Sequence, residues 1–188
     1  MEPRTIFFIG KPGSGKGVQA RMLAEKTGWP LIIASDQIRA IAGENSAVGR
    51  KLREVIDAGI LTPSWFPNYV FLKTIFSLPD GGSVIFDGFN RIVHEAEFNS
   101  EALEWIGRSY PVIYLIVSEN EVRRRLKLRK EEESRADDDA IDTRMEQYYK
   151  HTEASIEFFR KKEVLIEING EQTPEKIAAD IRTALQIE

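Results

Sequence analysis

The chain contains no cysteine, and this absence removes several classes of chemistry at once. Without a thiol there is no disulfide bond, no cysteine nucleophile and no cysteine-based zinc site. The chain also lacks a long apolar run, because no stretch approaches the roughly 20 residues that span a bilayer. The apolar run near the N-terminus is too short for a secretory signal. We therefore expect a soluble, cytoplasmic protein without a membrane partner.

The chain also has no excess of positive charge, and it contains few histidines. Lys and Arg number 26 against 30 Asp and Glu, which gives a formal net charge of −4 over 188 residues. A general nucleic-acid-binding protein needs an excess of cations, so we expect no nucleic-acid partner. The two histidines, His94 and His151, belong to no Ser–His–Asp or metal-ligand pattern. The length suggests a single domain.

Short apolar runs alternate with helical patterns along the chain. Most of the runs are continuously apolar, which is typical of strands covered on both faces of a parallel sheet. They occupy residues 6–9, 31–34, 84–86, 112–117 and 164–168. Between them, Val48, Leu52 and Ile56 recur at helical spacing, as Ile177 and Ile181 do near the C-terminus. The alternation predicts an α/β fold.

Two segments interrupt this alternation. Residues 36–78 contain helical patterns but no convincing strand, and they are too long for one crossover. We interpret them as a helical insertion beside the sheet. Residues 129–139 are nearly all charged and cannot bury a face, so we expect a solvated helix end or a loop there.

A phosphate-binding loop follows the first apolar run. The sequence GKPGSGK from Gly10 to Lys16 fits the GxxxxGK pattern. Its glycines allow several backbone N–H groups to face one anion, and the helix that follows points its positive end to the same place. The Lys16 ammonium adds a full charge for the β- and γ-phosphates. The residues expected to bind ATP here are Gly13, Ser14, Gly15, Lys16, Gly17 and Val18.

The loop lacks the hydroxyl that many phosphate-binding loops use to bind magnesium. Gly17 follows Lys16 where such proteins carry Ser or Thr, and Val18 has no hydroxyl either. Magnesium that arrives with ATP must therefore be held mainly by phosphates, waters and another carboxylate. Asp87 ends the third apolar run, and a carboxylate at the carboxyl end of a strand faces the ligand crevice of an α/β sheet. We expect Asp87 to hold Mg²⁺ through water; capping of the next turn is the alternative role.

Taken together, these motifs resemble the adenylate kinase family of nucleoside monophosphate kinases, in its short-lid form. The match runs in order from about residue 4 to residue 150. GKPGSGKGVQA at 10–20 resembles the family's GxPGxGKGTQA, and DGFNR at 87–91 resembles its DGFPR. SDQIR at 35–39 is similar to the family's TGDxLR, and GILTP at 59–63 is similar to its GxLVP. RADD at 135–138, together with Arg144, is similar to its lid signature RxDD…R.

The resemblance implies a fold and a reaction. The fold is a five-stranded parallel P-loop NTPase core flanked by helices. The implied parts are a core at 1–35, 79–125 and 140–188, a nucleoside monophosphate-binding insertion at 36–78, and a short lid at 126–139. The reaction is transfer of the ATP γ-phosphoryl group to a nucleoside monophosphate, which the family resemblance makes AMP. We expect a monomer whose partners are ATP and the monophosphate.

The resemblance also assigns roles to arginines. Phosphoryl transfer needs placement and charge cancellation more than covalent help, and the planar guanidinium grips phosphate oxygens in pairs. By the resemblance, Arg39 and Arg91 clamp the acceptor phosphate, and Arg125 lies against the ATP adenine. Arg129, Arg135 and Arg144 close over the transferring group, with Asp137 and Asp138 orienting them or joining the lid hinge. Solvated surface charge is the alternative for each. The expected catalytic set is Lys16, Arg91, Arg129, Arg135 and Arg144, and the expected acceptor site is Ala34, Ser35, Arg39, Leu61, Gly88, Arg91 and Glu95.

The acceptor site departs from the family at Glu95, where adenylate kinases usually place a glutamine that reads adenine. An amide donates to adenine N1 and accepts from N6, whereas an ionised carboxylate only accepts. A carboxylate suits guanine, which offers the N1 and N2 donors. The alternatives are therefore the same reaction on another base such as GMP, or a Glu95 that points to solvent.

Two further readings stay open. Val18, Ala34 and Asn90 also replace family residues, and Asn90 exchanges a rigid turn residue for a flexible one. A kinase for another small metabolite is one alternative, although the paired Arg39 and Arg91 suit a phosphate-bearing acceptor. A non-catalytic nucleotide-binding regulatory protein is the other.

Overall fold

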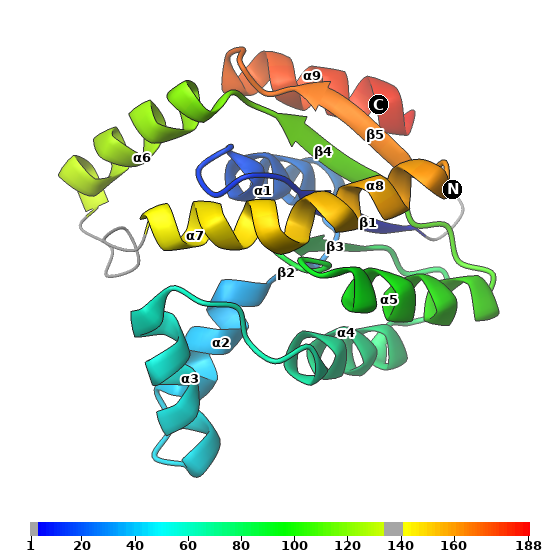
Figure 1. The fold of residues 1–188 in the computed structure, drawn as a ribbon. Coiled ribbons are helices and arrows are strands. Elements are labelled where there is room, and N and C mark those ends of the chain that lie inside the picture. Colours follow the sequence, from blue (N-terminus) through cyan, green and yellow to red (C-terminus); the bar gives the residue numbers. More distant parts are fainter. Residues whose placement is uncertain (1–3, 134–140) are drawn as a thin grey trace.

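A computed structural model describes residues 4–133 and 141–188, and a single parallel sheet lies at its centre (Figure 1). The strand order is β2-β3-β1-β4-β5, and all four pairings are parallel. The predicted five-stranded α/β fold is confirmed. The strands are β1 (Thr5–Ile9), β2 (Leu31–Ile33), β3 (Val84–Asp87), β4 (Val112–Ile116) and β5 (Leu165–Asn169).

Helices connect the strands and cover both faces of the sheet (Figure 1). Their bounds are α1 (Lys16–Thr27), α2 (Ala34–Ala42), α3 (Ala47–Ala58), α4 (Trp65–Ser77), α5 (Val93–Trp105), α6 (Glu119–Glu133), α7 (Ile141–Gln147), α8 (Glu153–Lys161) and α9 (Pro174–Leu185). A π-helical turn, η2 (Tyr148–Thr152), joins α7 to α8. No helix in the described part of the chain is both long enough and apolar enough to cross a bilayer.

The two faces of the sheet carry separate cores because successive side chains of a strand point in opposite directions. On β1, Ile6 and Phe8 pack with residues of α1 and α9. Phe7 and Ile9 lie in the opposite core, with residues of α4, α5 and α8. The result is a three-layer α/β/α arrangement in which helices bury both faces of the sheet, as the continuously apolar runs predict.

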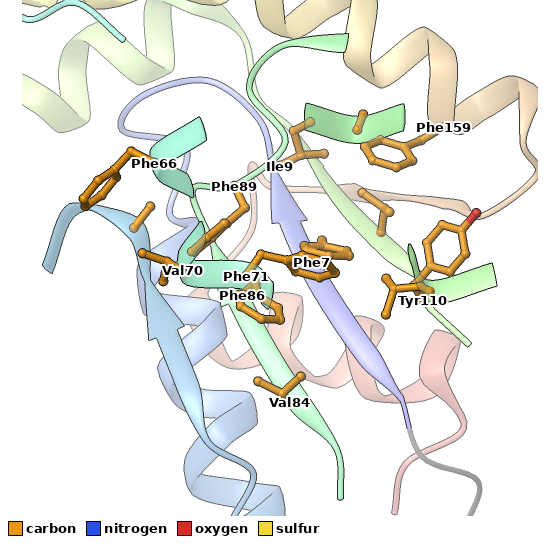
Figure 2. Packing of buried hydrophobic residues seen from close by; sticks show 14 of the residues in the cluster. Phe7, Ile9, Phe66, Val70, Phe71, Val84, Phe86, Phe89, Tyr110 and Phe159 are labelled. Atoms are coloured by element: carbon orange, nitrogen blue, oxygen red, sulfur yellow. The ribbon is translucent and has the colours of Figure 1, made fainter. Parts of the chain in front are cut away.

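A cluster of phenylalanines holds α4 on the sheet (Figure 2). The rings of Phe7 and Phe86 stack with centroids 5.3 Å apart, and Phe71 of α4 lies 5.5 Å from Phe86 and 6.1 Å from Phe7. By contrast, α2 and α3 pack against each other and project from one end of the sheet (Figure 1). The three helices between β2 and β3 therefore occupy two different places in the molecule.

The strand expected at residues 31–34 ends one residue earlier than its apolar pattern suggests. Ile33 is the last extended residue and the N-cap of α2, and Ala34 is the first residue of that helix. Since β1, β2 and β3 are parallel, the segments that follow Ile9, Ile33 and Asp87 all emerge at the same edge of the sheet. This edge is where ligands bind in open α/β sheets.

The packing of α4 leads to a stability prediction within one helix. Phe71 is fully buried, whereas 79% of Phe76 is exposed. We expect Phe71→Ala to lower the free energy of unfolding by about 3–5 kcal/mol, because it leaves a cavity among aromatic rings. The control Phe76→Ala should change it by less than about 0.5 kcal/mol. Urea denaturation followed by circular dichroism measures both, and equal losses would contradict the role of Phe71.

Candidate active site

The phosphate-binding loop connects β1 to α1 and curls through two left-handed glycines. Gly13 has φ +77° and Gly15 has φ +96°. An added Cβ at Gly13 would lie 2.6 Å from Cγ of Leu126, so a side chain there would also collide with α6. Lys16 begins α1, and its Nζ donates to the carbonyl oxygens of Gly10 at 2.9 Å and Lys11 at 2.7 Å. The ammonium group is thus held over the loop.

Asp87 reaches the same loop from the end of β3. Its side chain is buried, and Oδ1 accepts no hydrogen bond from the described residues. Burial raises the pKa of Asp87, while the charges of Lys16 and Arg91 act in the opposite direction. An added Cβ at Gly17 would lie only 3.2 Å from Oδ2 of Asp87. The carboxylate therefore lies beside position 17, where other phosphate-binding loops carry a hydroxyl.

These observations fit a magnesium ion that arrives with its nucleotide. A buried carboxylate oxygen without a partner suits a water-bridged cation beside the phosphates. Across the described ranges, no group of three or more His, Cys, Asp or Glu could hold a metal by itself. Phosphates and waters would therefore supply most of the ligands, and Asp87 is the protein group that fits the remaining role.

The loop after β3 carries Arg91 in a fixed position. Gly88 has φ +80°, and an added Cβ there would lie 2.8 Å from Nη2 of Arg91. The Arg91 Nε donates to the Gly88 carbonyl at 2.8 Å. Asn90 is fully buried at φ +58°, and its Oδ1 accepts from Nδ2 of Asn99 at 2.7 Å. Proline, which the family motif has at this position, cannot adopt a positive φ. In the conformation seen here, the hydrogen bond between the buried amide side chains of Asn90 and Asn99 anchors the loop.

Glu95 does not point to solvent. It lies in the first turn of α5 with 4% of its surface exposed, and its Oε2 accepts from the Arg91 backbone N–H at 2.9 Å. Burial raises the pKa of Glu95 to about 7, although backbone hydrogen bonds from Arg91 and Ile92 and the charge of Arg91 lower it. Near neutral pH this carboxyl group therefore exists in both protonation states.

A cavity of about 550 Å³ brings together the cationic residues and the residues expected to bind the acceptor nucleotide. Lys16, Arg39, Arg91 and Arg144 line it from α1, α2, the β3–α5 loop and α7. Ala34, Ser35, Leu61, Gly88 and Glu95 also line it. The remaining wall is largely apolar and includes Ile38, Val55, Ile56, Ile60, Phe66 and Phe89. The cavity thus combines several cations with an apolar wall that contains one carboxyl group.

Two predicted arginines are held by neighbouring groups. Arg39 donates from Nη2 to Oγ of Ser35 at 3.0 Å and to Asp36 at 2.7 Å, and it is about half exposed. Arg125 connects α6 to the phosphate-binding loop, because Nη1 donates to the Ser14 carbonyl at 3.2 Å and Nη2 to that of Gly170 at 2.8 Å. Arg125 does not line the cavity.

The structure covers only part of the expected lid. Arg129 belongs to α6, four residues after Arg125. Arg135, Asp137 and Asp138 lie outside the described residues. The catalytic roles expected for Arg129 and Arg135 therefore stay predictions.

Sequence reasoning missed several residues that line the cavity after Arg144. Gln147, Tyr148 and Thr152 all face it, from the end of α7 and from η2. The Tyr148 hydroxyl lies 3.2 Å from that of Tyr114, and Nζ of Lys11 lies 6.0 Å from the Tyr148 ring centroid. No motif marks these residues, and the orientation of Thr152 depends on a π-helical turn that apolar periodicity does not show.

Comparison with known proteins agrees with this geometry. The family model described as adenylate kinase matches residues 8–164. The adenylate kinase of Thermus thermophilus is 32% identical over 187 residues, covering 98% of each chain. The adenylate kinase of Leifsonia xyli is 31% identical over 183 residues (96% of this chain, 92% of its own), and that of Maricaulis maris is 32% identical over 184 (96% and 98%). The chain therefore belongs to the adenylate kinase family, and it is a phosphotransferase that acts on nucleoside monophosphates.

Proposed function

We propose that the protein transfers the γ-phosphoryl group of magnesium-bound ATP to AMP, which yields two molecules of ADP. The observation that carries the proposal is the cavity shared by Lys16, Arg39, Arg91 and Arg144. Four cations from four separate elements converge there, beside a wall that is apolar enough for a base. The paired Arg39 and Arg91 suit an acceptor that carries a phosphate, because a guanidinium binds phosphate oxygens in pairs.

The chemistry consists of placement and charge cancellation. An oxygen of the AMP phosphate attacks the γ-phosphorus, the bond to the β–γ bridging oxygen breaks, and its electron pair leaves with ADP. Lys16 stabilises the ATP phosphates, and Arg39 and Arg91 hold the acceptor phosphate in line. Arg144 neutralises charge on the transferring group. Magnesium, when bound, lowers the negative charge of the ATP phosphates, with Asp87 as its protein partner through water.

Glu95 supports AMP as the acceptor when it carries a proton. A neutral carboxyl group has one donor and one acceptor, so it can donate to adenine N1 and accept from N6 as an amide does. GMP is the second candidate, because the ionised form can accept from guanine N1 and N2. The pKa of about 7 favours a mixture of both forms under ordinary conditions.

The oligomeric state, the location and the division into parts are proposals of the same kind. We propose that the protein works as a monomer. We propose the cytoplasm as its location, by analogy with the family. The division into core, acceptor-binding insertion at 36–78 and lid at 126–139 also stays a prediction. Lid closure would exclude water and so protect ATP from hydrolysis.

The proposal predicts the outcome of an acceptor panel. With ATP and magnesium, we expect diphosphate formation from AMP, and Lys16→Ala should reduce it by about a hundredfold or more because the phosphates lose a positioned charge. The control is Lys26→Ala, an exposed lysine of the same helix, which should retain activity. Coupled assays with AMP, GMP, CMP and UMP measure the result. Tight ATP binding without diphosphate from any acceptor would overturn the proposal and favour a regulatory protein.

The role of Glu95 predicts a change in base preference. Glu95→Gln supplies a permanent donor and acceptor, so we expect it to favour AMP further and to lower kcat/KM for GMP by about tenfold or more. Glu97→Gln removes an exposed carboxylate two residues further along the same helix and should leave both values unchanged. If both variants keep the wild-type AMP to GMP ratio, Glu95 does not read the base.

The raised pKa predicts that base preference depends on pH. Below pH 7 the carboxyl group is mainly protonated and pairs with adenine, whereas above pH 7 it is mainly ionised and pairs with guanine. From pH 6 to pH 8 the protonated fraction falls from about 90% to about 10%, so the ratio of kcat/KM for AMP to that for GMP should fall with rising pH. Titration of the acceptor phosphate affects both kcat/KM values alike, so it does not change their ratio. In Glu95→Gln the ratio should be flat, and a flat wild-type ratio would contradict the prediction.

A further inference from the structure

A nearly continuous helix runs along the front of the molecule through α7, η2 and α8, and it carries Arg144 near its start (Figure 1). An α-helix turns by about 100° per residue, so the eighth residue after Arg144 would normally lie about 80° away from it around the axis. The π-helical turn takes up one extra residue, as the bond from the Glu153 N–H to the Tyr148 carbonyl marks. Thr152 consequently faces the same cavity as Arg144 and Tyr148.

The contact that this alignment permits is a hydrogen bond to Arg91. Thr152 is 5% exposed, and its Oγ1 donates to the Arg91 carbonyl at 3.0 Å. The backbone N–H of Arg91 donates to Glu95 at 2.9 Å, and its Nε donates to Gly88 at 2.8 Å. Arg91 is therefore fixed at its amide, its carbonyl and its side chain by three different residues.

We propose that Thr152 is a positioning residue, which sets the Arg91 guanidinium for the acceptor phosphate and ties it to the helix that carries Arg144. The π-helical turn is the device that makes this possible, since it brings Thr152 onto the face of Arg144. Two phosphate-binding arginines from distant parts of the sequence then share one rigid frame. The inference rests on the proposed function, because it takes Arg91 to bind the acceptor phosphate.

The test replaces the hydroxyl without changing the shape of the side chain. We expect Thr152→Val to raise KM for AMP about fivefold while KM for ATP is unchanged, since one hydrogen bond to the Arg91 peptide is lost. Thr152→Ser keeps the hydroxyl and should restore the wild-type value. The matched control is Thr74→Val, which removes a similar hydroxyl bond to the Val70 carbonyl within α4 and should leave both KM values unchanged.

A double-mutant cycle separates positioning from general stabilisation. If Thr152 acts through Arg91, Thr152→Val should add no further rise in KM to an Arg91→Ala enzyme. Additive effects, or a Thr152→Val enzyme with a wild-type KM for AMP, would overturn the proposal. An inactive wild-type enzyme would instead refute the proposed function. If the wild-type enzyme is inactive, calorimetry can compare the affinity for AMP of the wild type with that of Thr152→Val. Equal affinities would overturn the positioning role.

Discussion

The parallel pairing of β1 with β3 is the constraint on which the site depends. Its register places Phe7 opposite Phe86 and Phe8 opposite Asp87, so Asp87 ends its strand where β1 enters the phosphate-binding loop. A slip by one residue would reverse the faces of the whole strand, moving Phe86 out of the aromatic core and Asp87 away from the loop. The cost of moving Phe86 out of its packing with Phe7 and Phe71 and into the opposite core therefore also fixes the position of the carboxylate.

The site concentrates positive charge in a chain whose net charge is negative, and local pairing makes this possible. The Lys16 ammonium lies against backbone carbonyls, Arg39 pairs with Asp36, and Arg91 donates to the Gly88 carbonyl. Each of these partners is weaker than a phosphate, because a carbonyl carries only a partial charge and the Arg39–Asp36 pair is half exposed. An entering phosphate can therefore compete with these partners for cations that are already positioned.

Local motifs made the core of this site predictable, whereas backbone details and burial did not. The phosphate-binding loop and the end of β3 are read from contiguous residues, and the sheet edge brings them together by topology alone. The burial of Glu95 depends on packing between α5 and the β3–α5 loop, which no local pattern reports. Asn90 adopts a positive φ because Asn99, nine residues later, fixes its side chain. Thr152 reaches Arg91 only through an extra residue in a helical turn, and periodicity analysis assumes that such turns are absent.

The hydrogen bond between Arg91 and Glu95 gives the neutral carboxyl group a defined orientation. Oε2 accepts from the Arg91 backbone N–H, so in the protonated state the hydrogen belongs on Oε1. A glutamine can turn its amide over, and a free carboxylic acid can carry its proton on either oxygen, but here the backbone donor favours one arrangement. The same contact ties the group proposed to read the base to the residue proposed to hold the acceptor phosphate. In the proposed mechanism, recognition of the base and placement of the phosphate are therefore properties of one hydrogen-bonded unit, which spans Thr152, Arg91 and Glu95.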